Sequence, residues 1–113
     1  TGKYQEALAD FDKTIELGNK TVEAYRFRAF VKEKLKNYFQ AIADYKIGIK
    51  IAKLKNNDIG WGICLRGIAN AYIGLKKYYA AINYFKKELA LKLKYARNIN
   101  EKKSAQSRWY TWC

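Results

Sequence analysis

Residues that catalyse reactions or bind metals are sparse in this chain of 113 residues. Histidine is absent, so neither Cys64 nor Cys113 has an imidazole base, and the two cysteines do not form a CxxC pair of the kind that binds zinc. Glu6, Asp10 and Asp12 are isolated carboxylates that suit solvated charges on a helix. We therefore expect a chain that is not an enzyme and that binds no metal and no cofactor.

The cysteines and the hydropathy also bear on where the protein works. Cys64 is expected to be a small buried residue on a helix and Cys113 a free thiol, which favours a reducing compartment. No apolar run approaches the roughly 20 residues that span a bilayer. We expect a cytoplasmic protein without membrane insertion. The missing initiator methionine also suggests a piece of a longer chain.

Positive charge is concentrated in the second half of the chain. Residues 1–45 hold eight Lys or Arg against seven Asp or Glu, whereas residues 46–113 hold fifteen against three. This asymmetry in a formal charge of +13 indicates a surface for nucleic acid or an acidic partner. Eighteen of the 23 basic residues are lysine, so AT-rich codons are a competing explanation. The expected basic surface consists of Lys46, Lys50, Lys53, Lys86, Lys87 and Lys94.

The pattern of apolar residues predicts an all-α chain. Apolar positions recur at i, i+3, i+4 and i+7, the spacing of amphipathic helices. Thr21 and Asp58 are the expected N-caps of the second and fourth helices, and polar residues 97–100 are expected to form a break before the last one. The expected helices, about six in number, cover roughly residues 2–17, 22–35, 38–54, 59–73, 78–94 and 101–112.

Three of these segments are copies of one sequence pattern. GKYQEALADFDKTIEL (2–17), KNYFQAIADYKIGIKI (36–51) and KKYYAAINYFKKELAL (76–91) align without gaps at spacings of 34 and 40 residues. In every copy an alanine is followed four positions later by an aromatic residue, and these positions are expected to lie in the core: Ala7 and Phe11, Ala41 and Tyr45, Ala81 and Phe85.

The helices that precede these copies align as well, with Tyr25 and Ala29 above Leu65 and Ala69. Together the motifs resemble the tetratricopeptide repeat, although its closing proline is absent. The resemblance implies an α–α superhelix, that is, a right-handed solenoid of antiparallel helical hairpins. It divides a single domain over residues 1–113 into units at about 1–20 (partial), 21–55, 58–97 and 98–113 (partial or a capping helix).

The resemblance also implies where a partner binds. In this family the first helix of each hairpin lines a concave groove, and the groove-facing positions include Glu23, Arg26, Phe30, Lys34, Ile63, Arg66, Asn70 and Ile73. Arg66 and Asn70, one helical turn apart, are expected to bind a carboxylate or a peptide backbone. The resemblance therefore implies a non-catalytic adaptor for a protein or peptide partner.

Two other functions remain open. The basic second half fits an RNA-binding module, and the exposed terminal helices fit an oligomerisation or scaffold segment that stacks on other copies. Trp109 bears on such stacking, because it falls where Ala29 and Ala69 stand in the other units. Either the register slips there, or Trp109 and Trp112 cover the last apolar stripe, or both are ordinary buried aromatic residues.

Overall fold

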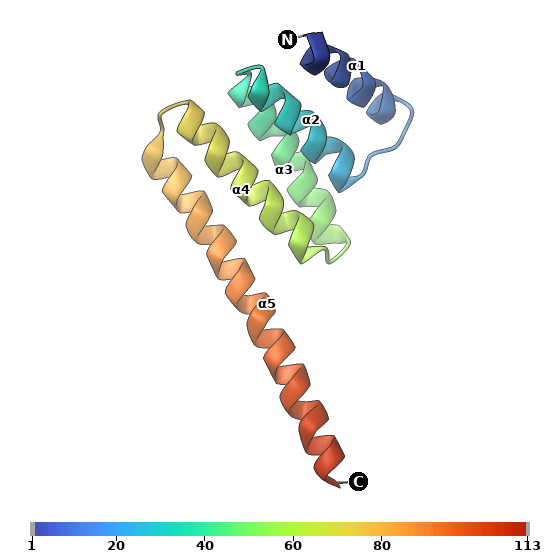
Figure 1. Cartoon of the computed structure of the whole chain (residues 1–113), viewed down its shortest axis with the longest axis vertical. Coiled ribbons are helices and arrows are strands. Elements are labelled where there is room, and N and C mark those ends of the chain that lie inside the picture. Colours follow the sequence, from blue (N-terminus) through green and yellow to red (C-terminus); the bar gives the residue numbers. More distant parts are fainter. Residues whose placement is uncertain (1, 113) are drawn as a thin grey trace.

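Five α-helices make up the part of the chain that the structure describes (Figure 1). The computed structural model describes the backbone of residues 2–112 and the side chains of residues 2–108. The side chains of Trp109 and Trp112, predicted to cover the last stripe, lie outside the described residues. The predicted all-α class is confirmed, and the helices are α1 (Gly2–Glu16), α2 (Val22–Lys34), α3 (Tyr38–Leu54), α4 (Asp58–Gly74) and α5 (Tyr78–Trp112).

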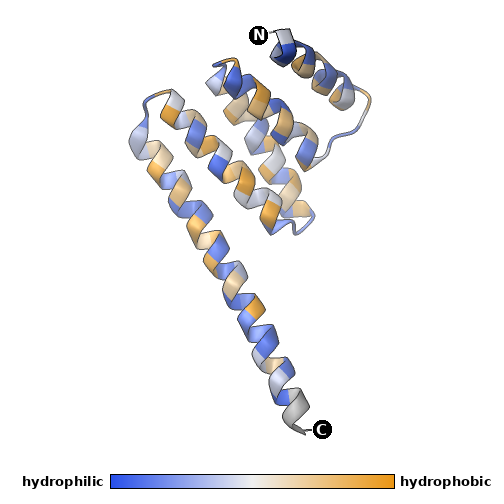
Figure 2. Ribbon diagram, viewed as in Figure 1, coloured by the Kyte–Doolittle hydropathy of each residue, from blue (hydrophilic) through white to orange (hydrophobic). Residues whose placement is uncertain are grey.

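Helix α5 is unbroken, and its second half extends away from the other helices (Figure 1). The predicted break at 97–100 and the predicted sixth helix over 101–112 are therefore wrong. Residues 92–108 contain neither glycine nor proline, the residues least compatible with a helix, and are mostly good helix formers. Hydrophilic residues predominate in this half of α5 (Figure 2), and most of them are exposed on a continuous helix where a turn was predicted. Within the described part of the chain, no helix combines the length and the apolar character needed to cross a membrane.

Helices α1 to α4 end in the same hydrogen-bonded turn. After α2, the N–H of Lys36 donates to the carbonyl oxygen of Glu33 at 2.9 Å, and the N–H of Asn37 donates to that of Lys32 at 2.8 Å. These two bonds define the Schellman motif, in which a left-handed residue follows the helix. In the four turns that residue is Gly18, Lys36, Asn56 or Lys76, with φ of 98°, 63°, 53° and 60°, respectively.

Side-chain caps begin two of the helices. The Oγ1 of Thr21 accepts a hydrogen bond from the N–H of Ala24 at 3.1 Å, so the predicted cap of α2 is confirmed. The cap of α4 is Asn57 and not Asp58, because the Oδ1 of Asn57 accepts from the N–H of Gly60 at 2.9 Å. Asp58 lies in the first turn of α4, where its charge suits the positive end of the helix dipole.

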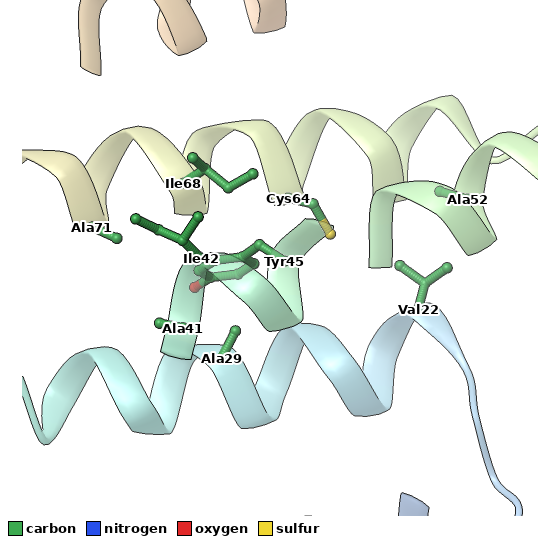
Figure 3. Packing of buried hydrophobic residues seen from close by; sticks show 9 residues of the cluster. All are labelled: Val22, Ala29, Ala41, Ile42, Tyr45, Ala52, Cys64, Ile68 and Ala71. Carbon is green, nitrogen blue, oxygen red and sulfur yellow. The ribbon is translucent and has the colours of Figure 1, made fainter. Parts of the chain in front are cut away.

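The core lies between α2, α3 and α4, where alanines alternate with larger side chains (Figure 3). Cys64 is fully buried there with a free thiol, and its predicted burial is confirmed. The small residues let the three helices approach closely enough for the larger side chains to fill the space between them. The buried cluster consists of Val22, Ala29, Ala41, Ile42, Tyr45, Ala52, Cys64, Ile68 and Ala71.

Glycines of α4 face tyrosine rings of α3. A Cβ at Gly67 would overlap the ring of Tyr45, and a Cβ at Gly74 would overlap the ring of Tyr38. The two contacts are seven residues apart on each helix, which is about two turns, so they repeat along one antiparallel seam. Because these glycines have no side chain, the rings rest directly on the backbone of α4.

Alanine at two glycines of α4 should have opposite effects on stability. Gly67→Ala should lower the free energy of unfolding by about 1–3 kcal/mol, because the new methyl group displaces the Tyr45 ring from the seam. Gly62→Ala should raise it by about 0.5–1 kcal/mol, since a Cβ there meets only Leu91 Cδ2 at 3.8 Å and alanine favours the helix. Urea unfolding followed by circular dichroism measures both changes. If both substitutions changed the free energy of unfolding in the same direction, the close contact of the Tyr45 ring with Gly67 would be contradicted.

A buried carboxylate joins the first three helices. Asp44 of α3 is 3% exposed and accepts hydrogen bonds from Nε and Nη2 of Arg28 in α2, at 2.9 and 2.8 Å. The Nζ of Lys32 lies 2.9 Å from the same carboxylate, and Arg28 also contacts Asp12 of α1 at 3.0 Å. The hydrogen bond with Asp44 is the main reason why the pKa of Arg28 is raised. This pairing offsets the cost of taking the Asp44 charge out of water.

Each helix packs on its neighbours in sequence, and α2 also contacts α4. Among the described residues, the backbones of α1, α3 and α5 do not approach one another closely. Equivalent positions therefore differ in burial: Tyr45 in α3 is 3% exposed, whereas Phe85 in α5 is 36% exposed because no described helix packs on its outer side. The prediction that Phe85 lies in the core is wrong for this reason, while Ala41 and Ala81 are buried as predicted.

Candidate functional site

A hollow between α2 and α4 gathers five of the eight residues predicted to line a groove. Its volume is about 330 Å³. Phe27, Tyr45 and Gly67 complete the lining. The hollow thus combines exposed apolar surface with guanidinium and amide groups, and the five predicted residues in it are Arg26, Phe30, Ile63, Arg66 and Asn70.

The other three predicted residues do not line this hollow. Glu23 is exposed in the first turn of α2, and Ile73 is 44% exposed near the end of α4. The ammonium of Lys34 lies 5.0 Å from the ring centroid of Phe30. Lys34 therefore approaches the site only through its cation–π contact with Phe30.

The floor of the hollow is Tyr45, which the sequence placed in the core but not in the site. Its ring rests on Gly67, and its hydroxyl donates to Oε1 of Glu33 in α2 at 3.3 Å. Burial and the nearby Glu33 raise the pKa of Tyr45 above its ordinary value. Burial also raises the pKa of Glu33, against the opposing effects of the Tyr45 hydrogen bond and Lys34. The phenol stays protonated at neutral pH and can keep its bond to α2.

Arg66 is held by a carboxylate that was not predicted. Its Nε and Nη2 lie 2.8 and 2.7 Å from Oε2 of Glu88 in α5, and the Nζ of Lys92 lies 3.2 Å from the same oxygen. Glu88 is only 6% exposed. Burial by itself would raise the pKa of Glu88, but the hydrogen bonds from Arg66 and Lys92 outweigh it and lower the pKa. The sequence offers one clue to this ion pair, because Glu88 is the only acidic residue between residues 59 and 100.

A second hollow adjoins the first at Ile63 and Arg66, which line both. It has a volume of about 410 Å³ and lies between α4 and α5. Ile59, Leu91 and Tyr95 are among its apolar lining residues. We call the two hollows together the α4 groove; the second one is lined by Asp58, Ile59, Gly62, Ile63, Arg66, Glu88, Leu91, Lys92 and Tyr95.

The predicted basic surface divides into two groups. Lys53, Lys87 and Lys94 line a third hollow of about 510 Å³, formed by α3, α4 and α5. Lys46 and Lys50 on α3, and Lys86 on α5, are exposed and do not line it. The basic residues of the second half of the chain are therefore partly gathered around one concave surface.

The described residues offer little for metal binding or thiol chemistry. No group of three or more His, Cys, Asp or Glu side chains in that part of the chain is arranged to hold a metal ion. Burial raises the pKa of Cys64 to about 11, so its thiol is protonated at neutral pH.

Comparison with the models of known protein families found no match to this chain, and no curated protein matches it in sequence. Evidence on function therefore comes from the motifs of the sequence and the geometry of the surface. That geometry provides an apolar groove with polar groups over α4 and a separate basic hollow.

Glu88→Gln should destabilise the protein in a pH-dependent way. Because the folded-state pKa of Glu88 is lowered, its ion pair contributes stability above the unfolded pKa of about 4.3 and loses it as the pH falls through the folded-state pKa. At neutral pH the variant should lose about 1–2 kcal/mol of unfolding free energy. Urea unfolding of both proteins from neutral to acid pH should show this difference shrinking to nothing.

Glu16→Gln is the matched control for this experiment, because Glu16 is exposed in α1 and forms no ion pair among those of the described residues. Its effect should be small at every pH. A loss for Glu88→Gln that persists unchanged in acid would contradict the ion pair with Arg66.

Proposed function

We propose that this chain is a non-catalytic interaction module of the tetratricopeptide-repeat type, and that it binds a protein or peptide partner in the α4 groove. The repeat alignment supports the family assignment, because most of the aligned alanines are buried at helix contacts. Ala29, Ala41 and Ala69 are fully buried and Ala81 is 2% exposed, whereas Ala7 of the first copy is partly buried. Such small residues allow the close helix packing on which hairpin repeats depend.

Curvature supports the choice of face. The backbones of α2 and α4, the first helices of the two hairpins, approach each other closely, whereas those of the second helices, α3 and α5, do not within the described part of the chain. A stack whose second helices are spread apart curves toward its first helices. We therefore propose a right-handed solenoid with the α4 groove on its concave side.

The observation that carries the proposal is exposed apolar surface beside polar groups within one groove. Phe30 is 46% exposed and Ile59 is 65% exposed, which is costly in water unless a partner covers them. Asn70 and Arg26 line the same groove and offer an amide and a guanidinium to a peptide backbone or carboxylate. Arg66 serves less as a free anchor than as a group fixed by Glu88, so Asn70 and Arg26 take the larger part in recognition.

Two phenylalanines provide a matched test. Phe30 and Phe39 are both exposed, at 46% and 65%, and each has a lysine ammonium over its ring, Lys34 at 5.0 Å and Lys77 at 5.6 Å. Only Phe30 lines the α4 groove. Peptides selected against the wild-type protein should bind Phe30→Ala about tenfold or more weakly and Phe39→Ala as well as wild type.

The selection should use displayed peptides that lack Asp and Glu, so that lysines elsewhere on the surface do not dominate it. Binding is then measured by fluorescence anisotropy, with circular dichroism confirming that both variants are folded. Equal losses for the two variants, or a loss for Phe39→Ala alone, would show that the peptide binds elsewhere.

A further inference from the structure

The third hollow, between α3 and α5, lies on the opposite face of α4 from the α4 groove. Trp61 and Leu65 of α4 line it, whereas Ile63 lines the α4 groove. A step of two residues turns a helix by roughly 200°, so Trp61 and Leu65 both point away from the side of Ile63. The hollow therefore opens on the other side of α4 from Ile63, although Leu91 of α5 lines both it and the α4 groove. We call this hollow the lysine groove.

The lysine groove has an apolar floor and an ammonium rim. Ile49, Leu65, Ala90 and Leu91 contribute aliphatic surface to its lining, together with the rings of Trp61 and Tyr84. The rim comes from two helices, Lys53 on α3 and Lys87 and Lys94 on α5. The ammonium of Lys53 lies 4.8 Å from the Trp61 ring centroid, and that of Lys87 lies 4.5 Å from the Tyr84 ring centroid. These contacts hold two of the charges at the edges of the apolar floor.

No carboxylate is among the residues that line this groove. The second half of the chain contains three acidic residues, and two of them, Asp58 and Glu88, line the α4 groove instead. Lys46 and Lys50 lie on the same side of α3 as Lys53, because their spacing is that of successive helical turns. Within the part of the chain that the structure describes, the lysines of this groove thus form no ion pair with a carboxylate, in contrast to Arg66 and Arg28.

Charge and shape together favour one class of occupant. Ammonium groups already cover the Trp61 and Tyr84 rings, so nucleic-acid bases could stack on those faces only by displacing the lysines. Arginine, which pairs with phosphate in a bidentate way, is absent from the lining. An aliphatic or aromatic side chain fits the floor, and carboxylates on either side of it reach the rim.

We propose that the lysine groove binds an acidic peptide segment that carries apolar side chains. The carboxylates pair with Lys53, Lys87 and Lys94, and an apolar side chain packs against Trp61 and Leu65. The lysine groove shares no lining residue with the hollow between α2 and α4, so the protein can contact one partner segment in each of them at once.

The test compares two variants with the same change in net charge. K53E/K87E/K94E reverses the rim, and K13E/K20E/K103E reverses three exposed lysines elsewhere on the surface. The probes are a fluorescein-labelled peptide of Glu, Leu and Phe, the same peptide with Gln in place of Glu, and a labelled oligouridine. The Glu peptide should bind wild type and the control variant equally, and should bind the rim variant about tenfold or more weakly. The Gln peptide should bind all three proteins weakly.

Three results would overturn the proposal: no binding of the Glu peptide to wild type, equal weakening in both variants, or an oligouridine that binds wild type more tightly than the Glu peptide. A second measurement does not depend on the folding of the rim variant. Replacing Trp109 and Trp112 by Phe leaves Trp61 as the single indole, and the Glu peptide should change its fluorescence. Unchanged emission at saturating peptide would also overturn the proposal.

Discussion

The contact between the Tyr45 ring and the backbone of α4 at Gly67 governs how the central helices pack. Tyr45 belongs to α3, its ring rests on α4, and its hydroxyl donates to Glu33 of α2. One side chain thereby connects three helices and at the same time forms the floor of the hollow between α2 and α4. The depth of that hollow follows from the closeness that Gly67 permits. Tyr38 and Gly74 repeat the arrangement along the seam.

The two halves of the chain differ in how many of their charged residues form ion pairs. In the first half, Asp44 is buried between Arg28 and Lys32, and Arg28 also reaches Asp12, so acids and bases neutralise one another while joining α1, α2 and α3. In the second half, Glu88 is the counterpart, between Arg66 and Lys92. Most lysines there are exposed, and those of the lysine groove have no carboxylate among the lining residues. The uneven charge of the sequence thus corresponds to a real difference in how the two halves are held together.

The sequence predicts this fold well wherever a periodic pattern coincides with packing on both sides. Four helices, the cap at Thr21 and the burial of Cys64 follow from local signals, since caps and apolar stripes act over a few residues. The error at residues 97–100 arose because polar residues alone do not end a helix, and the chain there contains no glycine or proline. Phe85 shows a different limit, because its exposure depends on which helices lie nearby and not on its own motif.

The sequence predicted part of the lining of the candidate site but not its electrostatics. Repeat register placed Arg26, Phe30, Ile63, Arg66 and Asn70 on one surface, and they line one hollow. The alignment of the repeats does not predict which charged residues pair between helices. The ion pair of Arg66 with Glu88 was therefore missed, as was the position of Tyr45 at the floor of the hollow. The lysine groove was missed as a hollow because its residues come from three helices and share no motif.

A peptide partner in the α4 groove on the side of α2 and α4 can be located by a heteronuclear NMR titration of the labelled protein with a peptide that it selects. Amide and side-chain shift changes should concentrate at Arg26, Phe30, Ile63 and Asn70, with the Tyr45 ring responding beneath them. Shift changes confined to α3 and α5, with Phe30 and Asn70 unaffected, would contradict this location of the peptide.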